Sequence, residues 1–217
     1  MAHFEDATNE YSTIHSSFEG EVLSRLRRDT WLSTTKPQML SDPIQGRFLS
    51  TITKMIRPLK ILELGAFTGY STICLSEGLE KGGVIDTVEI NDELQDMHEK
   101  YFHEAGIVES VNIHYGHALD VINSGELKGP YDMVWIDADK EHQIEYVKFA
   151  ISKLRVGGWL LVDNVIWGGA VLDKKKLSNI DSGASRIHRL NQYISCCEDV
   201  ENVLLPVWDG VQILRKL

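Results

Sequence analysis

Two uninterrupted apolar runs that end in acidic side chains restrict the fold more than any other feature of the chain. Residues 133–136 (MVWI) lead into 137–140 (DADK), and residues 159–162 (WLLV) lead into Asp163 and Asn164. Short continuous apolar runs are typical of strands that are buried on both faces of a parallel sheet. In such sheets, ligands bind beyond the carboxyl ends of the strands. The sequence therefore predicts a parallel α/β sheet with a polar site at these two strand ends.

If the two strands are neighbours, Asp137, Asp163 and Asn164 bring three oxygen-bearing side chains to one point. Hard oxygen ligands suit Mg²⁺, Ca²⁺ or Mn²⁺ better than Zn²⁺. A lone acid at a strand end more often starts a loop or caps a helix. Two such ends together favour a divalent-cation site, for which Mg²⁺ is the expected ion, and Lys140 lies a few residues away.

Strand-like runs alternate with helix-like segments through most of the chain, as in a mainly parallel sheet covered by helices on both faces. We expect strands at 59–64, 84–90, 111–115, 131–137 and 158–163, and helices at 10–32, 43–57, 91–105 and 183–196. Two β runs, 200–207 and 211–217, flank an Asp-Gly turn and predict a terminal antiparallel pair. The polar stretch that ends near residue 182 is long for a simple connection, so 170–182 is a candidate active-site loop.

The length of 217 residues, with 43% hydrophobic and 25% charged residues, fits one globular domain. We expect a single domain over 1–217, with 1–57 as a helical extension that packs on it. The net charge of -10 argues against binding to nucleic acid or to an anionic membrane. We find neither a membrane-length apolar stretch nor the blocks of a signal peptide, so a cytoplasmic location is expected. The three cysteines lack C-x-x-C spacing, which indicates neither a disulfide framework nor a thiolate metal site.

Residues 63–71 (ELGAFTGYS) follow the first predicted strand and open a helix, which is the setting of a nucleotide-type loop. Gly65 and Gly69 would let a ligand approach the backbone, but their spacing is not the G-x-G-x-x-G of dinucleotide sites. Glu89 lies near the end of the second predicted strand, and an acid about twenty residues beyond such a loop can hold a ribose diol. Residues 115–118 (YGHA) are placed to wall an adenine ring.

These segments resemble the cation-dependent class I methyltransferases of the caffeoyl-coenzyme A and catechol O-methyltransferase type. The resemblance covers nearly the whole chain and rests on 39–46 (MLSDPIQG), 63–71, 137–140, 163–169 (DNVIWGG) and 209–211 (DGV). It implies a doubly wound, seven-stranded, mostly parallel Rossmann-like sheet with an antiparallel C-terminal strand. It also implies a homodimer.

The resemblance further implies which residues form the site. S-adenosylmethionine would be bound by Ser41, Glu63, Gly65, Ser71, Glu89 at the ribose, Ala118 near the adenine and Asp137 near the methionine part. The metal ligands would be Asp137, Asp163 and Asn164. Lys140 matches the catalytic lysine of the family and would act as general base, with Asp137 as the second catalytic residue. Asp139 is left without an assigned role.

The expected reaction is methylation of one hydroxyl of a small vicinal diphenol, such as a catechol-like, caffeoyl or flavonoid-like acceptor. Gln45 stands where plant members commonly have Glu, and residues 170–186 do not match the Arg and Tyr residues that those enzymes use on an acyl thioester. A coenzyme A ester is therefore not the expected substrate. An NAD-dependent short-chain oxidoreductase would need a Tyr-x-x-x-Lys pair, which the chain lacks. A non-catalytic S-adenosylmethionine-binding protein is the other alternative, and methyl transfer to any catechol would exclude it.

Overall fold

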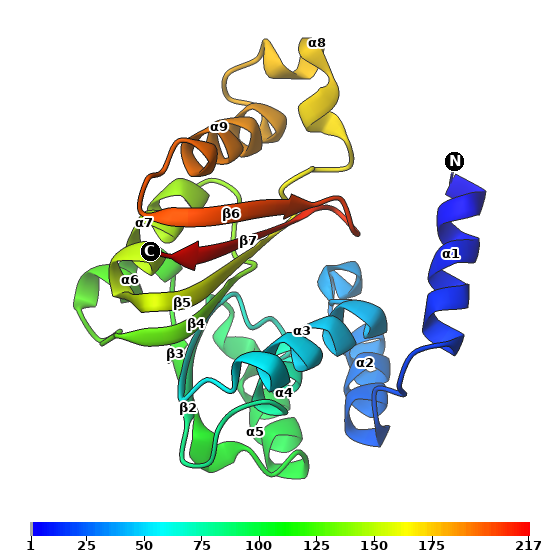
Figure 1. Cartoon of the computed structure of the whole chain (residues 1–217). Helices are drawn as coiled ribbons and strands as arrows, with labels where there is room; N and C mark the ends of the chain where they lie inside the picture. The colour runs from blue at the N-terminus through cyan, green and yellow to red at the C-terminus, as the bar shows by residue number, and fades with distance from the viewer. Residues whose placement is uncertain (1) are drawn as a thin grey trace. The chain divides into compact units, whose positions relative to one another are not determined.

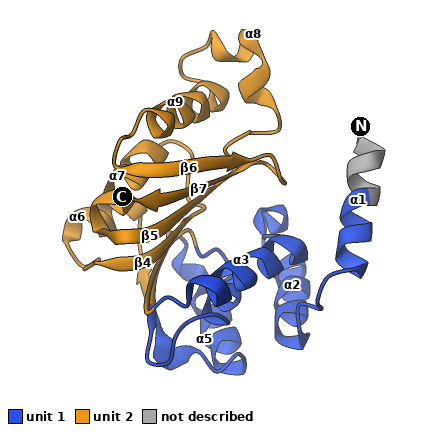
Figure 2. Cartoon of the chain, viewed as in Figure 1, with its two compact units in different colours: residues 1–58, 66–84, 91–111 blue, residues 59–65, 85–90, 112–217 orange. Residues whose placement is uncertain are grey.

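The computed structural model describes residues 2–217, with side chains from Thr8 onward. Contacts within the chain define two compact units, which Figure 2 colours separately. Unit 1 comprises the described part of residues 1–58 together with 66–84 and 91–111, and unit 2 comprises 59–65, 85–90 and 112–217. The predicted single domain begins at Met1, which lies outside the described residues, and its organisation as one domain stays a prediction.

Seven strands form one sheet in the order β3-β2-β1-β4-β5-β7-β6 (Figure 1). β1 is parallel to β4 and β4 to β5, whereas β7 is antiparallel to both β5 and β6. The predicted seven-stranded, mostly parallel α/β sheet with an antiparallel C-terminal strand is therefore confirmed. The strands are β1 (Lys60–Leu64), β2 (Val84–Glu89), β3 (Val111–Tyr115), β4 (Tyr131–Ile136), β5 (Leu154–Asp163), β6 (Val200–Leu205) and β7 (Val211–Lys216).

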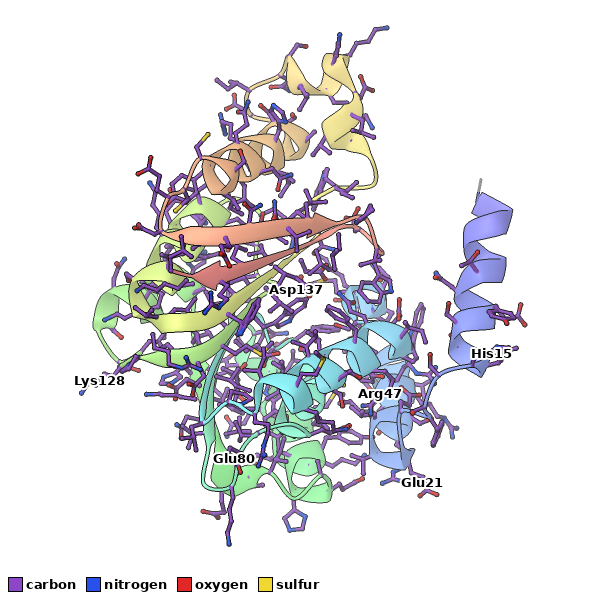
Figure 3. The ribbon with its side chains drawn as sticks, viewed as in Figure 1. His15, Glu21, Arg47, Glu80, Lys128 and Asp137 are labelled. Atoms are coloured by element: carbon purple, nitrogen blue, oxygen red, sulfur yellow. The ribbon has the colours of Figure 1, made fainter. Side chains whose placement is uncertain are left out.

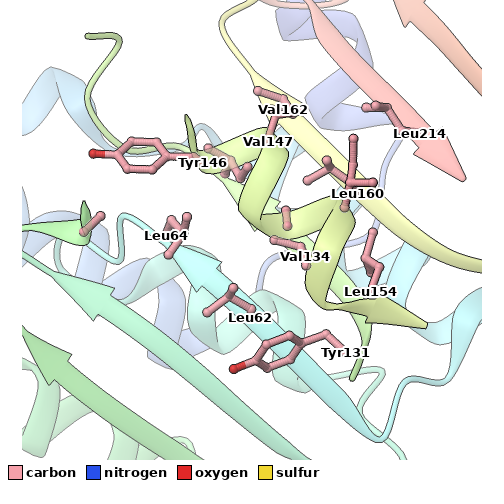
Figure 4. Packing of buried hydrophobic residues seen from close by; sticks show 14 of the residues in the cluster. Leu62, Leu64, Tyr131, Val134, Tyr146, Val147, Leu154, Leu160, Val162 and Leu214 are labelled. Atoms are coloured by element: carbon pink, nitrogen blue, oxygen red, sulfur yellow. The ribbon is translucent and has the colours of Figure 1, made fainter. Parts of the chain in front are cut away.

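The central strands are buried on both faces, as their unbroken apolar runs predict. Residues 133–136 of β4 are all 0% exposed. Alternate residues of β1, β4 and β5 belong to one apolar cluster of unit 2, to which helices α6 (Ala118–Ser124), α7 (Gln143–Lys153) and α9 (Gly183–Ser195) also contribute (Figure 4). Burying one large apolar side chain stabilises a fold by about 1.5–3 kcal/mol. This cluster therefore holds the strand ends that carry the predicted site.

The segment 170–182, predicted as a loop, contains two short helices, η4 (Ala170–Leu172) and α8 (Lys174–Leu177). The carboxylate of Asp173 caps α8 by accepting hydrogen bonds from the first backbone N–H groups of the helix. The hydroxyl of Ser182 caps α9 in the same way, and α9 begins where the sequence predicts. The segment is therefore locally structured in spite of its polar composition.

Unit 1 is mainly helical. The prediction of its first helix is wrong in extent. Instead of one helix over 10–32 there are two, separated by residues 15–20. None of the described helices has the length and apolar character needed to cross a membrane. The helices of unit 1 are α1 (Ala2–Ile14), α2 (Glu21–Ser33), η1 (Pro37–Met39), α3 (Pro43–Ile56), α4 (Tyr70–Ser76), η2 (Asp92–Leu94), α5 (Gln95–Glu104) and η3 (Val108–Ser110).

A buried carboxylate explains the break between α1 and α2. Glu19 is 7% exposed and accepts hydrogen bonds from the Tyr70 hydroxyl and from the Arg27 guanidinium. A buried charge is tolerated only when it has such hydrogen-bond partners. The turn at 15–20 places the Glu19 carboxylate where Tyr70 and Arg27 can donate to it. Phe18, whose spacing suggests a continuous helix, is 71% exposed. Gly20 then starts α2 from a φ of 91°, which a helix does not adopt.

Candidate active site

Asp137 and Asp163 lie at the carboxyl ends of two neighbouring strands, β4 and β5. The parallel register pairs Ile136 of β4 with Val162 of β5, so each aspartate lies one residue further along its own strand. Asp163 is 3% exposed. Figure 3 labels Asp137 among the strands of unit 2. The fold therefore places these two predicted metal ligands next to each other in the register.

Asn164, the third predicted ligand, turns the chain sharply at the end of β5. Its backbone is left-handed, with a φ of 59°, a conformation that asparagine adopts more readily than most residues. Its N–H donates a hydrogen bond of 2.7 Å to the carboxylate of Asp163. The next two residues, Val165 and Ile166, donate backbone hydrogen bonds of 3.1 and 2.8 Å to carbonyls of the 209–210 turn. The Asp-Gly turn thus fixes the backbone that follows the predicted ligands.

Lys140 and Asp137, the two predicted catalytic residues, form an ion pair. The ammonium nitrogen of Lys140 lies 3.2 Å from Oδ1 of Asp137, and the two side chains are 16% and 23% exposed. Burial raises the pKa of the Asp137 carboxyl, and the charge and hydrogen bond of Lys140 oppose that change. The site therefore contains a largely buried carboxyl group whose ion-pair partner is the Lys140 ammonium group.

The end of β1 approaches the backbone of Asp137 closely. A Cβ at Gly65 would lie 2.5 Å from the Asp137 carbonyl oxygen, which is too close for any side chain. The Asp137 N–H donates a 2.9 Å hydrogen bond to the carbonyl of Leu64. Glu63, two residues earlier, is 0% exposed and accepts a 2.7 Å hydrogen bond from Thr87. Glycine at position 65 is thus required by the packing of the strand ends.

Glu89 and Ala118 lie at the ends of the next two strands. Glu89 is the last residue of β2 and is 6% exposed, and its carbonyl accepts a 2.8 Å hydrogen bond from Gly116. Ala118 is the first residue of α6. Glu63, Gly65, Glu89, Ala118 and Asp137 therefore all lie at or near the carboxyl ends of β1 to β4 in unit 2.

Ser41 and Ser71, the other two residues predicted to bind S-adenosylmethionine, belong to unit 1. Ser41 precedes Asp42, which caps α3 by accepting a 2.9 Å hydrogen bond from the N–H of Gln45. Ser71 lies in the first turn of α4 and is 7% exposed. Their contribution to a common site with the residues of unit 2 stays a prediction.

The structure also joins His117, Asp139 and His142, which sequence analysis does not connect. A ring nitrogen of His142 lies 3.0 Å from Oδ1 of Asp139, and Nε2 of His117 lies 3.9 Å from its Oδ2. The Tyr146 hydroxyl donates a hydrogen bond to Asp139. Burial acts to raise the pKa of Asp139, but the hydrogen bonds from Tyr146 and His142 outweigh it and lower that pKa. The sequence shows only that a histidine follows each of two predicted strands. That His117 and His142 both reach Asp139 depends on the fold.

A cavity of about 430 Å³ lies beside the segment 170–182. Its lining residues include Trp167, Lys175, Lys176 and Gly183 at the start of α9. The cavity lies within unit 2, next to the segment that sequence analysis selects as an active-site loop.

Comparison with known proteins yields a consistent set of similarities. The model of a family described as O-methyltransferase matches residues 13–217. A flavonoid 3',5'-methyltransferase of Vitis vinifera is 30% identical over 207 residues, which cover 92% of this chain and 88% of the relative. A catechol O-methyltransferase of Niastella koreensis is 35% identical over 156 residues, which cover 71% of each chain. The crystal structure of an O-methyltransferase from Bacillus cereus in complex with SAH has a TM-score of 0.89, with 26% identity and 100% coverage of both chains.

Proposed function

The chain belongs to the O-methyltransferase family, and from this premise we propose that it methylates one hydroxyl of a small vicinal diphenol with the help of a divalent cation, preferably Mg²⁺. The chain is an S-adenosylmethionine-dependent O-methyltransferase of the caffeoyl-CoA and catechol type. The flavonoid and catechol named for two relatives support a diphenol as acceptor. The observation that carries the proposal is the adjacent placement of Asp137 and Asp163 at the ends of β4 and β5.

The donor set at these strand ends fits a hard divalent cation. Asp137 and Asp163 would provide carboxylate oxygens and Asn164 an amide oxygen, which are the ligand types that Mg²⁺ and Ca²⁺ prefer. Asp163 is 3% exposed, so a cation there would offset the cost of burying its charge. When bound, the cation would lower the pKa of a coordinated hydroxyl and hold its oxygen in place.

Lys140 is the proposed acceptor of the proton from the hydroxyl that is methylated. Its ammonium nitrogen lies 3.2 Å from Oδ1 of Asp137, so the side chain reaches the strand end that carries the proposed metal ligands. A hydroxyl bound to a cation at Asp137 would therefore lie beside the proposed proton acceptor.

Residues at the ends of β1, β2 and β3 are proposed to hold the methyl donor. S-adenosylmethionine supplies an activated methyl group when bound. Glu89 has two carboxylate oxygens with which to accept hydrogen bonds from a ribose diol. Gly65 leaves its loop without a side chain beside the Asp137 backbone, and Ala118 offers a small residue near the adenine. Glu63, Ser41, Ser71 and Asp137 complete the proposed binding set.

Of the two alternative functions, one is set aside by an observation and the other is addressed by experiment. Family membership replaces the NAD-dependent oxidoreductase interpretation. A non-catalytic S-adenosylmethionine-binding role would require that no acceptor is methylated, which an activity screen tests directly. The homodimer and the cytoplasmic location also stay proposals, and light scattering of the purified chain tests the first.

The proposed function is tested by a screen of acceptors with S-adenosylmethionine, in the presence of Mg²⁺ or of a chelator. The panel pairs each vicinal diphenol with the monophenol that lacks its second hydroxyl, and includes caffeoyl-coenzyme A. We expect methylation of the free diphenols only, dependent on Mg²⁺, with the methylated position read from the product. Equal rates on the monophenols, or undiminished activity with the chelator, would overturn the proposed metal-bound diphenol.

A further inference from the structure

Three side chains from the segments that follow β3 and β4 form a compact set of metal-binding atoms outside the proposed Mg²⁺ ligands. We call His117, Asp139 and His142 the HDH cluster. One ligand atom from each of the three lies within 4.8 Å of the other two. Among the described side chains, a search for three or more His, Cys, Asp or Glu residues with ligand atoms this close together finds the HDH cluster. All three belong to unit 2.

The distances in the HDH cluster are close to those of a bound ion. Oδ1 of Asp139 lies 3.0 Å from Nδ1 of His142, and Oδ2 of Asp139 lies 3.9 Å from Nε2 of His117. Ligand atoms of a tetrahedral zinc site are about 3.3 Å apart, because zinc–nitrogen and zinc–oxygen bonds are about 2.0–2.2 Å long. Small side-chain movements would therefore suffice, and side chains that are 32–40% exposed have room for them.

The ligands are also held in place by neighbouring groups, as metal ligands commonly are. The Tyr146 hydroxyl donates to one carboxylate oxygen of Asp139, and the N–H groups of Glu141 and His142 donate to the other at 3.0 and 3.1 Å. His117 is oriented at the start of α6, where its Nδ1 accepts a 3.3 Å hydrogen bond from Leu119. Coordination through Nε2 would move the ring proton to Nδ1 and give up this long hydrogen bond.

We propose that the HDH cluster binds a first-row transition metal ion such as Zn²⁺, with one atom of each side chain as ligand and water completing the coordination. Two imidazoles and one carboxylate favour such ions, whereas Mg²⁺ prefers oxygen ligands alone. The HDH cluster therefore offers nitrogen ligands that the Asp137, Asp163 and Asn164 set lacks. The proposal concerns binding and does not depend on the methyl-transfer reaction.

Titration of the untagged full-length chain with Co²⁺, followed by visible absorption, tests the proposal. Co²⁺ reports its coordination directly, and Zn²⁺ should displace it while Mg²⁺ should not. We use a Cys196→Ser, Cys197→Ser background so that thiolates contribute no signal. We expect one equivalent of Co²⁺ with the intense bands of a low-coordinate site. Absence of these bands, or their displacement by Mg²⁺, would overturn the proposal.

Substitutions then assign the ligands. His117→Ala and His142→Ala should each weaken Co²⁺ binding by at least tenfold, and Tyr146→Phe should weaken it by about tenfold through loss of the hydrogen bond to Asp139. His103→Ala, at an exposed histidine of α5, should leave the titration unchanged. Circular dichroism confirms folding, and His142→Asn replaces any alanine variant that does not fold. Unchanged binding in both histidine variants would show that the HDH cluster is only a set of ion pairs.

Discussion

Asp163 is the residue at which the proposed metal role separates most clearly from binding of the methyl donor. It is 3% exposed, and it follows Val162, the register partner of the residue that precedes Asp137. We predict that Asp163→Ala lowers methyl transfer by at least about 100-fold, since even residues that only support a ligand commonly cost 10–100-fold. The dissociation constant for S-adenosylmethionine, measured by calorimetry, should change little.

The matched variant for this prediction is Asp163→Asn. Its amide oxygen can still accept the 2.7 Å hydrogen bond from the N–H of Asn164, so the local backbone should be kept. The negative charge is lost, and an amide NH₂ group replaces one carboxylate oxygen. Wild-type activity of this variant would contradict a cation at this position.

Glu89 has the opposite expected profile, because it is proposed to hold the ribose. Glu89→Gln keeps the size of a side chain that is 6% exposed but removes its charge and one acceptor. Hydrogen bonds to charged groups contribute about 1.5–3 kcal/mol, so the dissociation constant for S-adenosylmethionine should rise about tenfold or more. Asp92→Asn, at an exposed acid nearby in sequence, is the control. Equal affinity in the two variants would remove Glu89 from the ribose.

Single residues differ in how far the sequence identifies them. The proposed role of Glu89 comes from its distance along the chain to the glycine loop, and that of Gly65 from the loop itself, because both lie at strand ends that the apolar runs predict. His117 and His142 cannot be paired in this way. Their meeting at Asp139 depends on side-chain directions after β3 and β4, which no linear pattern encodes.

The turn between β6 and β7 is the element that supports the predicted ligand segment, and Gly210 is its critical position. Gly210 has a φ of 84°, and a Cβ there would lie 2.5 Å from the Ile166 side chain. Gly82 has a similar φ of 80° with open space around it. We predict that Gly82→Ala lowers the free energy of unfolding by about 1–2 kcal/mol. Gly210→Ala should lower it further and should reduce the turnover rate, as urea denaturation and methyl-transfer assays would show. Equal stability losses would rule out the contact with Ile166.

Helix ends that depend on nearby residues can be predicted from the sequence, whereas helix ends that depend on contacts with distant residues cannot. Asn91 caps η2 through its side chain, and Gly106, with a φ of 70°, follows α5, so the prediction of a helix over 91–105 needs only local chemistry. The break at 15–20 has another cause. It accommodates a buried Glu19 whose partner Tyr70 lies far along the chain.

The stability of the whole molecule should fall in acid because both units contain carboxylates with lowered pKa values. Burial opposes the change at Glu77, but hydrogen bonds from Arg47 and neighbouring groups lower its pKa to about 2. Asp86, in unit 2, also has a pKa of about 2, where hydrogen bonds outweigh burial. Carboxyls of the unfolded chain take up protons first as the pH falls. The stabilisation is therefore complete above about pH 4.5 and is lost as the pH falls toward 2.

The contribution of Glu77 can be isolated by comparing wild type with Glu77→Gln in urea denaturation between pH 7 and pH 2. At pH 7 the variant should be less stable by no more than about 3 kcal/mol, and the difference should shrink as the pH approaches 2. The carboxylate also pairs with Lys54 at 2.8 Å, so added salt should reduce part of the difference. A difference that does not change with pH would contradict the lowered pKa.

The strand order β5-β7-β6 also has a consequence for biosynthesis. β6 emerges from the ribosome before β7, yet within the described sheet β7 is its one neighbour. Until β7 arrives, β5 presents an unpaired edge, which is a template for pairing with other chains. When β7 pairs with β5, Val211 pairs with Asp163. A single event therefore covers the exposed edge of β5 and completes the strand end that carries the proposed ligands.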